Sequence, residues 1–175
     1  MIMKVLVFSD SHGRIEPMQS IIRAHADTTD AILHLGDGAA EVLTLRSRFP
    51  SIPFHAVIGN CDSYTYSEFG IAADKCITLG GYALYLCHGD RFGVGGGVTA
   101  LAAYAAYKRA DIALYGHTHI AHEEYRAADG NNPRMWILSP GSVSRPRDGA
   151  LPSFGILDLT EHGVLFSVGR WSQEV

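Results

Sequence analysis

The stretch Lys4-Val5-Leu6-Val7-Phe8-Ser9-Asp10-Ser11-His12-Gly13 decides how the rest of the chain can fold. Four consecutive apolar residues run directly into a carboxylate and an imidazole that stand two positions apart. A short apolar run that ends in polar turn residues is typical of a buried strand. In open α/β sheets, ligands bind beyond the carboxyl ends of the strands. The stretch therefore predicts a central strand that delivers Asp10 and His12 to a site.

The same pattern recurs four more times along the chain. Apolar runs at residues 31–35, 54–58, 82–87 and 112–115 each end in side chains with potential ligand atoms. These side chains are Asp37, Asn60, Asp62, His88, Asp90, His117 and His119. Because strand ends of an α/β sheet meet at a common edge, we expect the five turns to converge on one place.

The remaining pattern predicts an α/β protein with two mixed sheets. Apolar residues at helical spacing predict helices over 17–25, 39–49 and 98–109. Helices between the first three strands imply parallel pairing through crossovers. Later strands are expected as antiparallel hairpins, namely 75–79 with 82–87, 122–127 with 135–138, and 154–159 with 164–170. We expect the two sheets to pack face to face with helices outside.

The composition excludes several classes of protein. The chain has 175 residues, of which 47% are hydrophobic, which suits one domain with one sizeable core rather than disorder. The formal net charge is −4 and there is no block of basic residues, so no nucleic-acid or membrane surface is indicated. The N-terminal apolar stretch has no cleavage site, and no apolar run approaches the ~20 residues of a membrane helix.

Cysteine usage predicts a reducing environment. The chain has three cysteines, Cys61, Cys76 and Cys87, and an odd number does not suggest a disulfide framework. Cys76 and Cys87 stand in apolar, strand-like runs, so we expect buried thiols there. We therefore expect a soluble, cytoplasmic protein.

The candidate ligands form a set whose chemistry points to metal ions. The set is Asp10, His12, Asp37, Asn60, His88, His117 and His119. Carboxylates, an amide oxygen and imidazoles suit Mn²⁺, Fe or Zn²⁺, do not exclude Ni²⁺ or Co²⁺, and fit poorly with Ca²⁺. Seven ligands are too many for one ion, and they suit two ions that share a carboxylate.

Each candidate ligand also has a structural interpretation. Asp10 and Asp37 precede predicted helices and are good helix caps. Asn60 is a residue type that tolerates a left-handed turn, and His88 would be satisfied in a core. The recurrence of the pattern at five strand ends favours the metal site over these alternatives.

Taken together, these turns resemble the calcineurin-like metallophosphoesterase superfamily. The resemblance rests on Asp10-Ser-His12, Gly36-Asp37, Gly59-Asn60-Cys-Asp62, His88-Gly and Gly116-His117-Thr-His119, and it extends to Ser139-Pro140-Gly141-Ser142-Val143-Ser144-Arg145-Pro146-Arg147 near the end. The small size and the cysteine after Asn60 resemble a compact bacterial and archaeal phosphodiesterase branch. That branch is related to the retromer subunit of the vacuolar sorting type. The resemblance implies a single metallophosphoesterase domain over residues 1–175 and a four-layer α/β/β/α sandwich.

The resemblance also implies how the ligands divide between two ions. One ion would be held by Asp10, His12, Asp37 and His119, and the other by Asp37, Asn60, His88 and His117. Asp37 would bridge them, and a metal-bridging hydroxide would attack phosphorus. Mn²⁺ is the expected activating ion. Catalytic roles are expected for Asp37, Asn60, His117 and Asp62.

Two positions depart from the pattern of the superfamily. Many members have histidine where this chain has Cys61, and a thiol is a weak hydrogen-bond donor, so we expect a preference for good leaving groups. Asp90 stands where the branch often has histidine. Asp62 is expected to orient a ligand, and Cys61 and Arg147 are candidates to contact the substrate phosphate.

The expected function is hydrolysis of phosphodiester bonds in a small substrate. The alternatives are a phosphomonoesterase acting on a nucleotide, a sugar phosphate or a phosphoprotein, and a metal-retaining protein-interaction scaffold. An antiparallel edge near the C-terminus is a place where a second copy of the chain could pair, which would give a homo-oligomer.

Overall fold

The computed structural model describes residues 2–130 and 132–172, and within them ten strands form two five-stranded sheets. The first sheet has the order β10-β9-β1-β2-β3, with strands Gly163–Arg170, Ser153–Thr160, Ile2–Phe8, Ala31–His34 and Phe54–Ala56. The second has the order β4-β5-β6-β8-β7, with strands Asp74–Leu79, Tyr82–Cys87, Ile112–Leu114, Met135–Pro140 and Ala121–Arg126.

Both sheets are mixed, as the sequence pattern predicts. In the first sheet β1 pairs in parallel with β2, and β2 with β3, whereas β9 runs antiparallel to β1. In the second sheet β6 lies in parallel between β5 and β8, and antiparallel β4 and β7 close the two edges. The parallel strands in each sheet end at the same edge, and this edge carries the candidate ligands.

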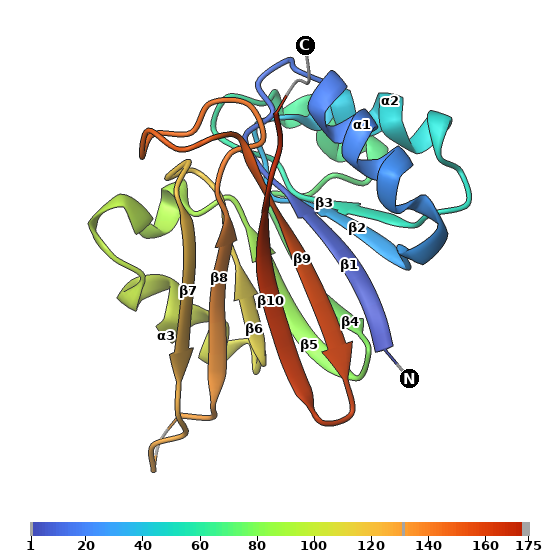
Figure 1. Cartoon of the computed structure of the whole chain (residues 1–175). Coiled ribbons are helices and arrows are strands. Elements are labelled where there is room, and N and C mark those ends of the chain that lie inside the picture. Colours follow the sequence, from blue (N-terminus) through green and yellow to red (C-terminus); the bar gives the residue numbers. More distant parts are fainter. Residues whose placement is uncertain (1, 131, 173–175) are drawn as a thin grey trace.

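Helices cover the outer face of each sheet (Figure 1). Helices α1 (Glu16–His25) and α2 (Ala39–Arg48) lie over the first sheet, where Met18, Ile22 and Leu45 join the core. Helix α3 (Thr99–Tyr107) lies over the second sheet and buries Leu101 against it. Short 3₁₀ helices complete the chain, namely η1 (Ala26–Thr28), η2 (Tyr64–Phe69), η3 (Asp90–Phe92) and η4 (Val94–Gly96).

The main core lies between the two sheets. Its members are fully or almost fully buried side chains from both sheets, among them Val5, Val7, Leu33, Leu84, Leu86, Ile112, Leu114, Leu138 and Leu157. Burying one such aliphatic side chain contributes about 1.5–3 kcal/mol. The order of layers is helix, sheet, sheet, helix, so the expected four-layer α/β/β/α sandwich is confirmed.

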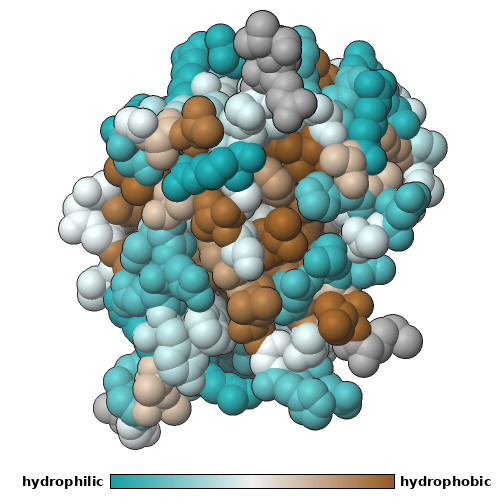
Figure 2. Space-filling model, in the orientation of Figure 1, coloured by the Kyte–Doolittle hydropathy of each residue, from teal (hydrophilic) through white to brown (hydrophobic). Residues whose placement is uncertain are grey.

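Strand β10 forms one edge of the first sheet, as expected for the C-terminal hairpin. Figure 2 shows apolar surface near the middle of the face where this strand runs in Figure 1. On β10, Leu165 is 61% exposed and Val168 is 37% exposed. Pairing of this edge with a second copy stays a prediction. Among the described residues, no helix combines the length and apolar character needed to cross a membrane.

The prediction of a buried thiol is right for Cys87 and wrong for Cys76. Cys87 is buried, but Cys76 is exposed. Cys76 lies opposite Tyr85 in the β4–β5 ladder, and Tyr85 is buried in the cluster that α3 covers. Strand β4 lies one position further out, at the edge of the sheet, so its Cys76 side chain stays in contact with solvent.

The turn between β4 and β5 packs against the first sheet, so substitutions in this turn can test how closely the two sheets pack. Gly80 and Gly81 both have positive φ, of 56° and 86°. A Cβ on Gly80 would lie 2.7 Å from Cβ of buried Leu159, whereas a Cβ on Gly81 would meet nothing within 4 Å. Gly80→Ala and Gly81→Ala each place an alanine in a left-handed conformation, which destabilises each variant by roughly 1–2 kcal/mol. Urea unfolding should show an additional loss of about 1 kcal/mol or more for Gly80→Ala. Equal losses in the two variants would contradict this packing.

Candidate metal centre

The structure brings all seven candidate ligands to one edge of the sandwich. The turn after β1 carries Asp10 and His12, and the turns after β2, β3, β5 and β6 carry the others, namely Asp37, Asn60, His88, His117 and His119. Each of the seven has a polar side-chain atom within 4 Å of another member of the set. The convergence expected from the strand ends is therefore observed.

These turns force non-glycine residues into left-handed backbone conformations. Of the six described non-glycine residues with positive φ, only Arg109 is outside the candidate set. The others are Asp10 at 55°, His12 at 45°, Asp37 at 57°, His117 at 67° and His119 at 62°. Such conformations cost roughly 1–3 kcal/mol each and persist where surrounding contacts impose them, commonly at functional sites.

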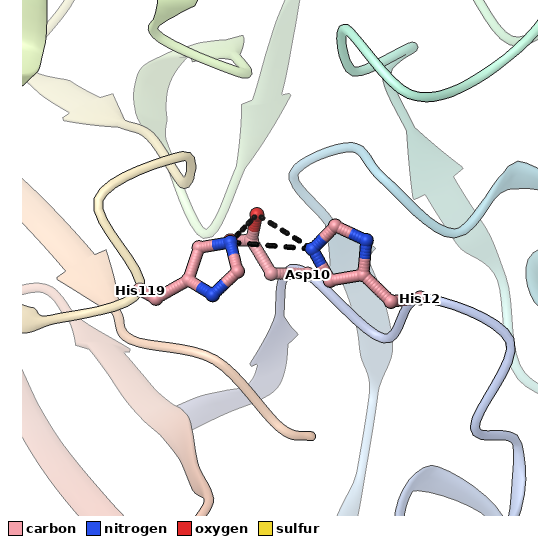
Figure 3. Close-up of side chains that lie close together, drawn as sticks. All are labelled: Asp10, His12 and His119. Atoms are coloured by element: carbon pink, nitrogen blue, oxygen red, sulfur yellow. Dashed lines mark hydrogen bonds and ion pairs between the residues drawn. The ribbon is translucent and has the colours of Figure 1, made fainter. Parts of the chain in front are cut away.

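One cluster consists of Asp10, His12 and His119, which point toward one another in Figure 3. Nε2 of His119 lies 3.2 Å from Nε2 of His12 and 3.1 Å from Oδ1 of Asp10. Oδ2 of Asp10 accepts hydrogen bonds from the Ser9 hydroxyl and the His117 amide. Oδ1 of Asp10 is buried and, apart from the imidazole nitrogens of His12 and His119, has no polar partner among the described residues. A cation placed among these three groups would satisfy that oxygen.

A second cluster forms around the side-chain oxygen of Asn60. This Oδ1 lies 3.0 Å from Nε2 of His88 and 3.0 Å from Nδ1 of His117. Nδ1 of His88 is 2.7 Å from the carbonyl oxygen of Leu35, so it carries a proton and donates to that carbonyl. In the neutral ring, Nε2 of His88 then presents a lone pair to the Asn60 oxygen, and two acceptors face each other. Either a proton or a metal ion must lie between them.

The carboxylate of Asp37 lies between the two clusters. Its Oδ2 is 3.8 Å from Nε2 of His12 and 3.4 Å from Nε2 of His88. Its Oδ1 accepts a hydrogen bond of 2.8 Å from the Cys61 amide. One carboxylate therefore faces an imidazole of each cluster, which is the position that a bridging ligand occupies.

The charges of these groups depend strongly on one another. Burial alone would raise the pKa of Asp37, but His88 and the Cys61 amide outweigh it and hold that pKa well below its usual value. Burial alone would lower the pKa of His88, but the contacts with Asp37 and Asp10 raise it to about 8. The contact with Asp10 also raises the pKa of His119. The carboxylates therefore favour positive charge on His88 and His119, whereas burial lowers the pKa values of His12 and His117.

His119 is oriented in the way that metal-binding histidines usually are. Its Nδ1 lies 2.6 Å from the carbonyl oxygen of Arg145, so this nitrogen donates outward and Nε2 faces the cluster. His88 has the same arrangement through Leu35. Hydrogen bonds of this kind fix the tautomer and the ring orientation of metal ligands. The donor set therefore fits divalent metal ions of the type expected from the sequence.

Asp62 contacts the backbone beneath the ligands rather than the ligands' side chains. Its carboxylate accepts hydrogen bonds from the amides of Asp37, Gly38, Ala39 and Gly59 at 2.8–3.3 Å. These amides include the N-terminus of α2 and the turn that carries Asp37. Asp62 therefore caps the helix from outside and holds the Asp37 turn, in line with the positioning role expected for it. Asp37 itself does not cap α2 through its side chain.

The candidate substrate contacts lie around the rim of the centre. Cys61 is exposed, and its sulfur is within 4.8 Å of ligand atoms of His12 and Asp37. Burial and the Asp37 carboxylate raise the pKa of this thiol above its usual value. The backbone amide of Arg147 donates a hydrogen bond to the carbonyl oxygen of His119. The positive charge of the Arg147 side chain acts to lower the pKa of the His119 imidazole. Asp90 begins η3, and its charge acts on His117.

Sequence reasoning assigned no role to the side chains that support the turn carrying Asp10 and His12. The hydroxyls of Ser142 and Ser144 both donate to the carbonyl oxygen of Asp10, at 2.8 Å each. Glu41 accepts hydrogen bonds from the Ser11 hydroxyl and the Gly13 amide. Ser142 and Ser144 are 132 and 134 residues from Asp10 in the chain. No local pattern predicts a contact over that separation.

A four-layer sandwich that gathers imidazoles, carboxylates and an amide at one strand edge is the arrangement expected from the resemblance to metallophosphoesterases. The chain belongs to the calcineurin-like phosphoesterase superfamily, because the model of that domain matches residues 3–162.

Relatives of known name are similar over most of the chain. The chain is 31% identical to the probable metallophosphoesterase YsnB of Bacillus subtilis (strain 168), over 90% of this chain and 85% of YsnB. It is 29% identical to the phosphodiesterase YfcE of Escherichia coli (strain K12), over 89% of this chain and 88% of YfcE. The fold matches a predicted phosphoesterase from Streptococcus pneumoniae TIGR4, with a TM-score of 0.77 and 24% identity over 97% of this chain and 90% of that one.

Replacing Asp62 should weaken metal binding without removing a candidate ligand. Asp62→Asn substitutes an amide nitrogen for one of the oxygens that accept backbone amides, so the Asp37 turn loses support. We expect the affinity for Mn²⁺ to fall about 10–100-fold, the usual effect of losing a group that orients ligands. Calorimetric titration measures it, and Asp27→Asn on exposed η1 is the control. Unchanged affinity in Asp62→Asn would contradict the role.

Proposed function

We propose that this chain is a dinuclear metal-dependent phosphoesterase that hydrolyses phosphodiester bonds. The observation that carries the proposal is the placement of Asp37, whose Oδ2 faces His12 of one cluster and His88 of the other. Two overlapping sets of four ligands then share a single carboxylate. Asp10, His12, Asp37 and His119 would hold one ion, and Asp37, Asn60, His88 and His117 the other.

Two divalent ions in these positions would supply a nucleophile from water and neutralise charge at the phosphoryl oxygens. The residues would bind the ions, with Asp37 shared between the two sets, and the carbonyls of Leu35 and Arg145 keep the His88 and His119 rings oriented. Mn²⁺ is the ion we propose, because carboxylate, amide and imidazole ligands suit it, and Fe, Ni²⁺, Co²⁺ and Zn²⁺ are compatible with the same donors.

Residues at the rim bear on the leaving group and on phosphate contact, and one relative supports the preference for diesters. Cys61 stands beside the centre where it can offer only a weak donor to a leaving group, so we propose a preference for esters of acidic alcohols. Arg147 is proposed to contact the substrate phosphate. The name of YfcE as a phosphodiesterase supports the choice of diesters over monoesters.

The proposal predicts metal-dependent hydrolysis that Asp37 controls. Metal-stripped protein should not cleave bis(p-nitrophenyl) phosphate, and the rate should rise with Mn²⁺ to a plateau at about two ions per chain. Under the same conditions p-nitrophenyl phosphate should be cleaved more slowly. Asp37→Ala and His117→Ala should lower the rate at least about a thousandfold, because each removes a ligand.

The matched control is His162→Ala, which removes an exposed histidine at the β9–β10 turn. It should leave the rate unchanged. Circular dichroism of each variant checks that the fold is intact. Full activity of Mn²⁺-loaded Asp37→Ala would contradict the mechanism. Faster cleavage of the monoester would replace the diesterase with a phosphomonoesterase.

A further inference from the structure

A groove with a volume of about 400 Å³ opens directly beside the candidate metal centre. Its lining includes His12 and Asp37 of the centre, the exposed Cys61 next to them, and Tyr66 on η2. Ala40, on the first turn of α2, lines it as well and is exposed. A groove of this size that shares two residues with the centre can hold a substituent attached to a phosphate bound there.

The groove offers little to bind a second anionic group. No lysine or arginine is among the described residues that line it. The amides at the N-terminus of α2, which would otherwise attract an anion, are already bonded to Asp62. Glu41 is a further carboxylate in the lining; it is buried and accepts hydrogen bonds from the Ser11 hydroxyl and the Gly13 amide. A further phosphate placed in this groove would meet negative charge and no free cation.

Positive charge lies instead beside the imidazoles of the first cluster. The charge of Arg145 acts on His12, and that of Arg147 acts on His119. Both arginines belong to the loop between β8 and β9, and neither lines the groove. Both arginines are therefore near the first cluster, whose His12 also borders the groove, whereas the rest of the groove lining is uncharged or acidic.

Tyr66 gives the groove an aromatic surface. It packs against the apolar cluster of α2 and β3 that contains Val42 and Ile58. Tyr66 is partly buried in this packing and also lines the groove. Aromatic rings stack well on other planar rings, and a pre-positioned ring loses little conformational entropy when it does so.

We propose that this groove binds one ester arm of the substrate, and that the arm it accepts is uncharged and carries a planar ring, as a nucleoside or an aryl alcohol does. The proposal rests on the proposed phosphodiesterase function and narrows the substrate class. An arm that bears an additional phosphate is disfavoured in the groove and is directed toward the arginine loop.

The first test removes the ring while keeping an apolar side chain. With Mn²⁺-loaded protein and bis(p-nitrophenyl) phosphate, both arms are identical, so the orientation of the substrate does not matter. Tyr66→Leu should raise KM roughly threefold to tenfold, which corresponds to the usual binding free energy of an aromatic pair. The effect on kcat should be smaller. Tyr66→Phe keeps the ring and should retain a KM close to that of the unchanged protein. The control is Tyr64→Leu, because Tyr64 belongs to the same η2 segment, is 72% exposed and does not line the groove.

The second test changes the charge of the groove at an exposed helix position. Ala40→Lys introduces a cation with a residue that favours helix, and Ala40→Gln is its uncharged control. The substrates are bis(p-nitrophenyl) phosphate and bis(3-carboxy-4-nitrophenyl) phosphate, which carries a carboxylate on both arms. Ala40→Lys should raise kcat/KM for the carboxylated diester relative to the uncharged one by roughly tenfold. Ala40→Gln should leave this ratio unchanged.

The outcomes separate this proposal from the one on which it rests. If the unchanged protein hydrolyses neither diester at any Mn²⁺ loading, the proposed function fails. If it hydrolyses them and correctly folded Tyr66→Leu keeps the original KM, the groove does not bind an arm and the inference is overturned. An unchanged ratio in Ala40→Lys overturns it as well. Thermal unfolding of each variant verifies that an effect does not arise from loss of fold.

Discussion

The structure of the candidate site depends on the carboxylate of Asp37 being held between two clusters of imidazoles. Its Oδ2 faces His12 and His88, while its Oδ1 is bonded to the Cys61 amide. The backbone at Asp37 is left-handed, and Asp62 holds it by accepting hydrogen bonds from the Asp37 and Gly38 amides of this turn and from the Gly59 amide of the next turn. Gly59 completes this constraint, because a Cβ there would lie 2.1 Å from Asp37 Oδ1. A small displacement of this turn would separate the two ligand sets.

The same arrangement explains why the fold has two sheets of similar construction. Each sheet ends parallel strands at the common edge, so turns from both sheets meet there. His88 and His117 come from the second sheet, and their contacts with Asn60 join it to the first. The apolar core between the sheets fixes their separation. The free energy of packing therefore holds together groups that would otherwise repel one another, and it maintains backbone conformations that would otherwise relax.

Much of this architecture could be predicted from the sequence because local patterns of apolar and polar residues determine it. Apolar runs that end in Asp10, Asp37, His88 and His117 marked both the strands and the candidate ligands. The supports of the site were less visible, because they join residues far apart in the chain, such as Ser142 and Ser144 with Asp10. The exposure of Cys76 depends on the edge position of β4, which only the sheet order reveals. The groove beside Tyr66 likewise depends on how η2 packs against α2.

The most direct test of the central claim is the distance between two metal ions bound to this protein. A crystal structure of the Mn²⁺-loaded chain, with the ions located by anomalous scattering, measures it. The account predicts two ions about 3.5–4 Å apart with one Asp37 oxygen bound to both. A single ion at full loading, or two ions that do not share Asp37, would contradict the account.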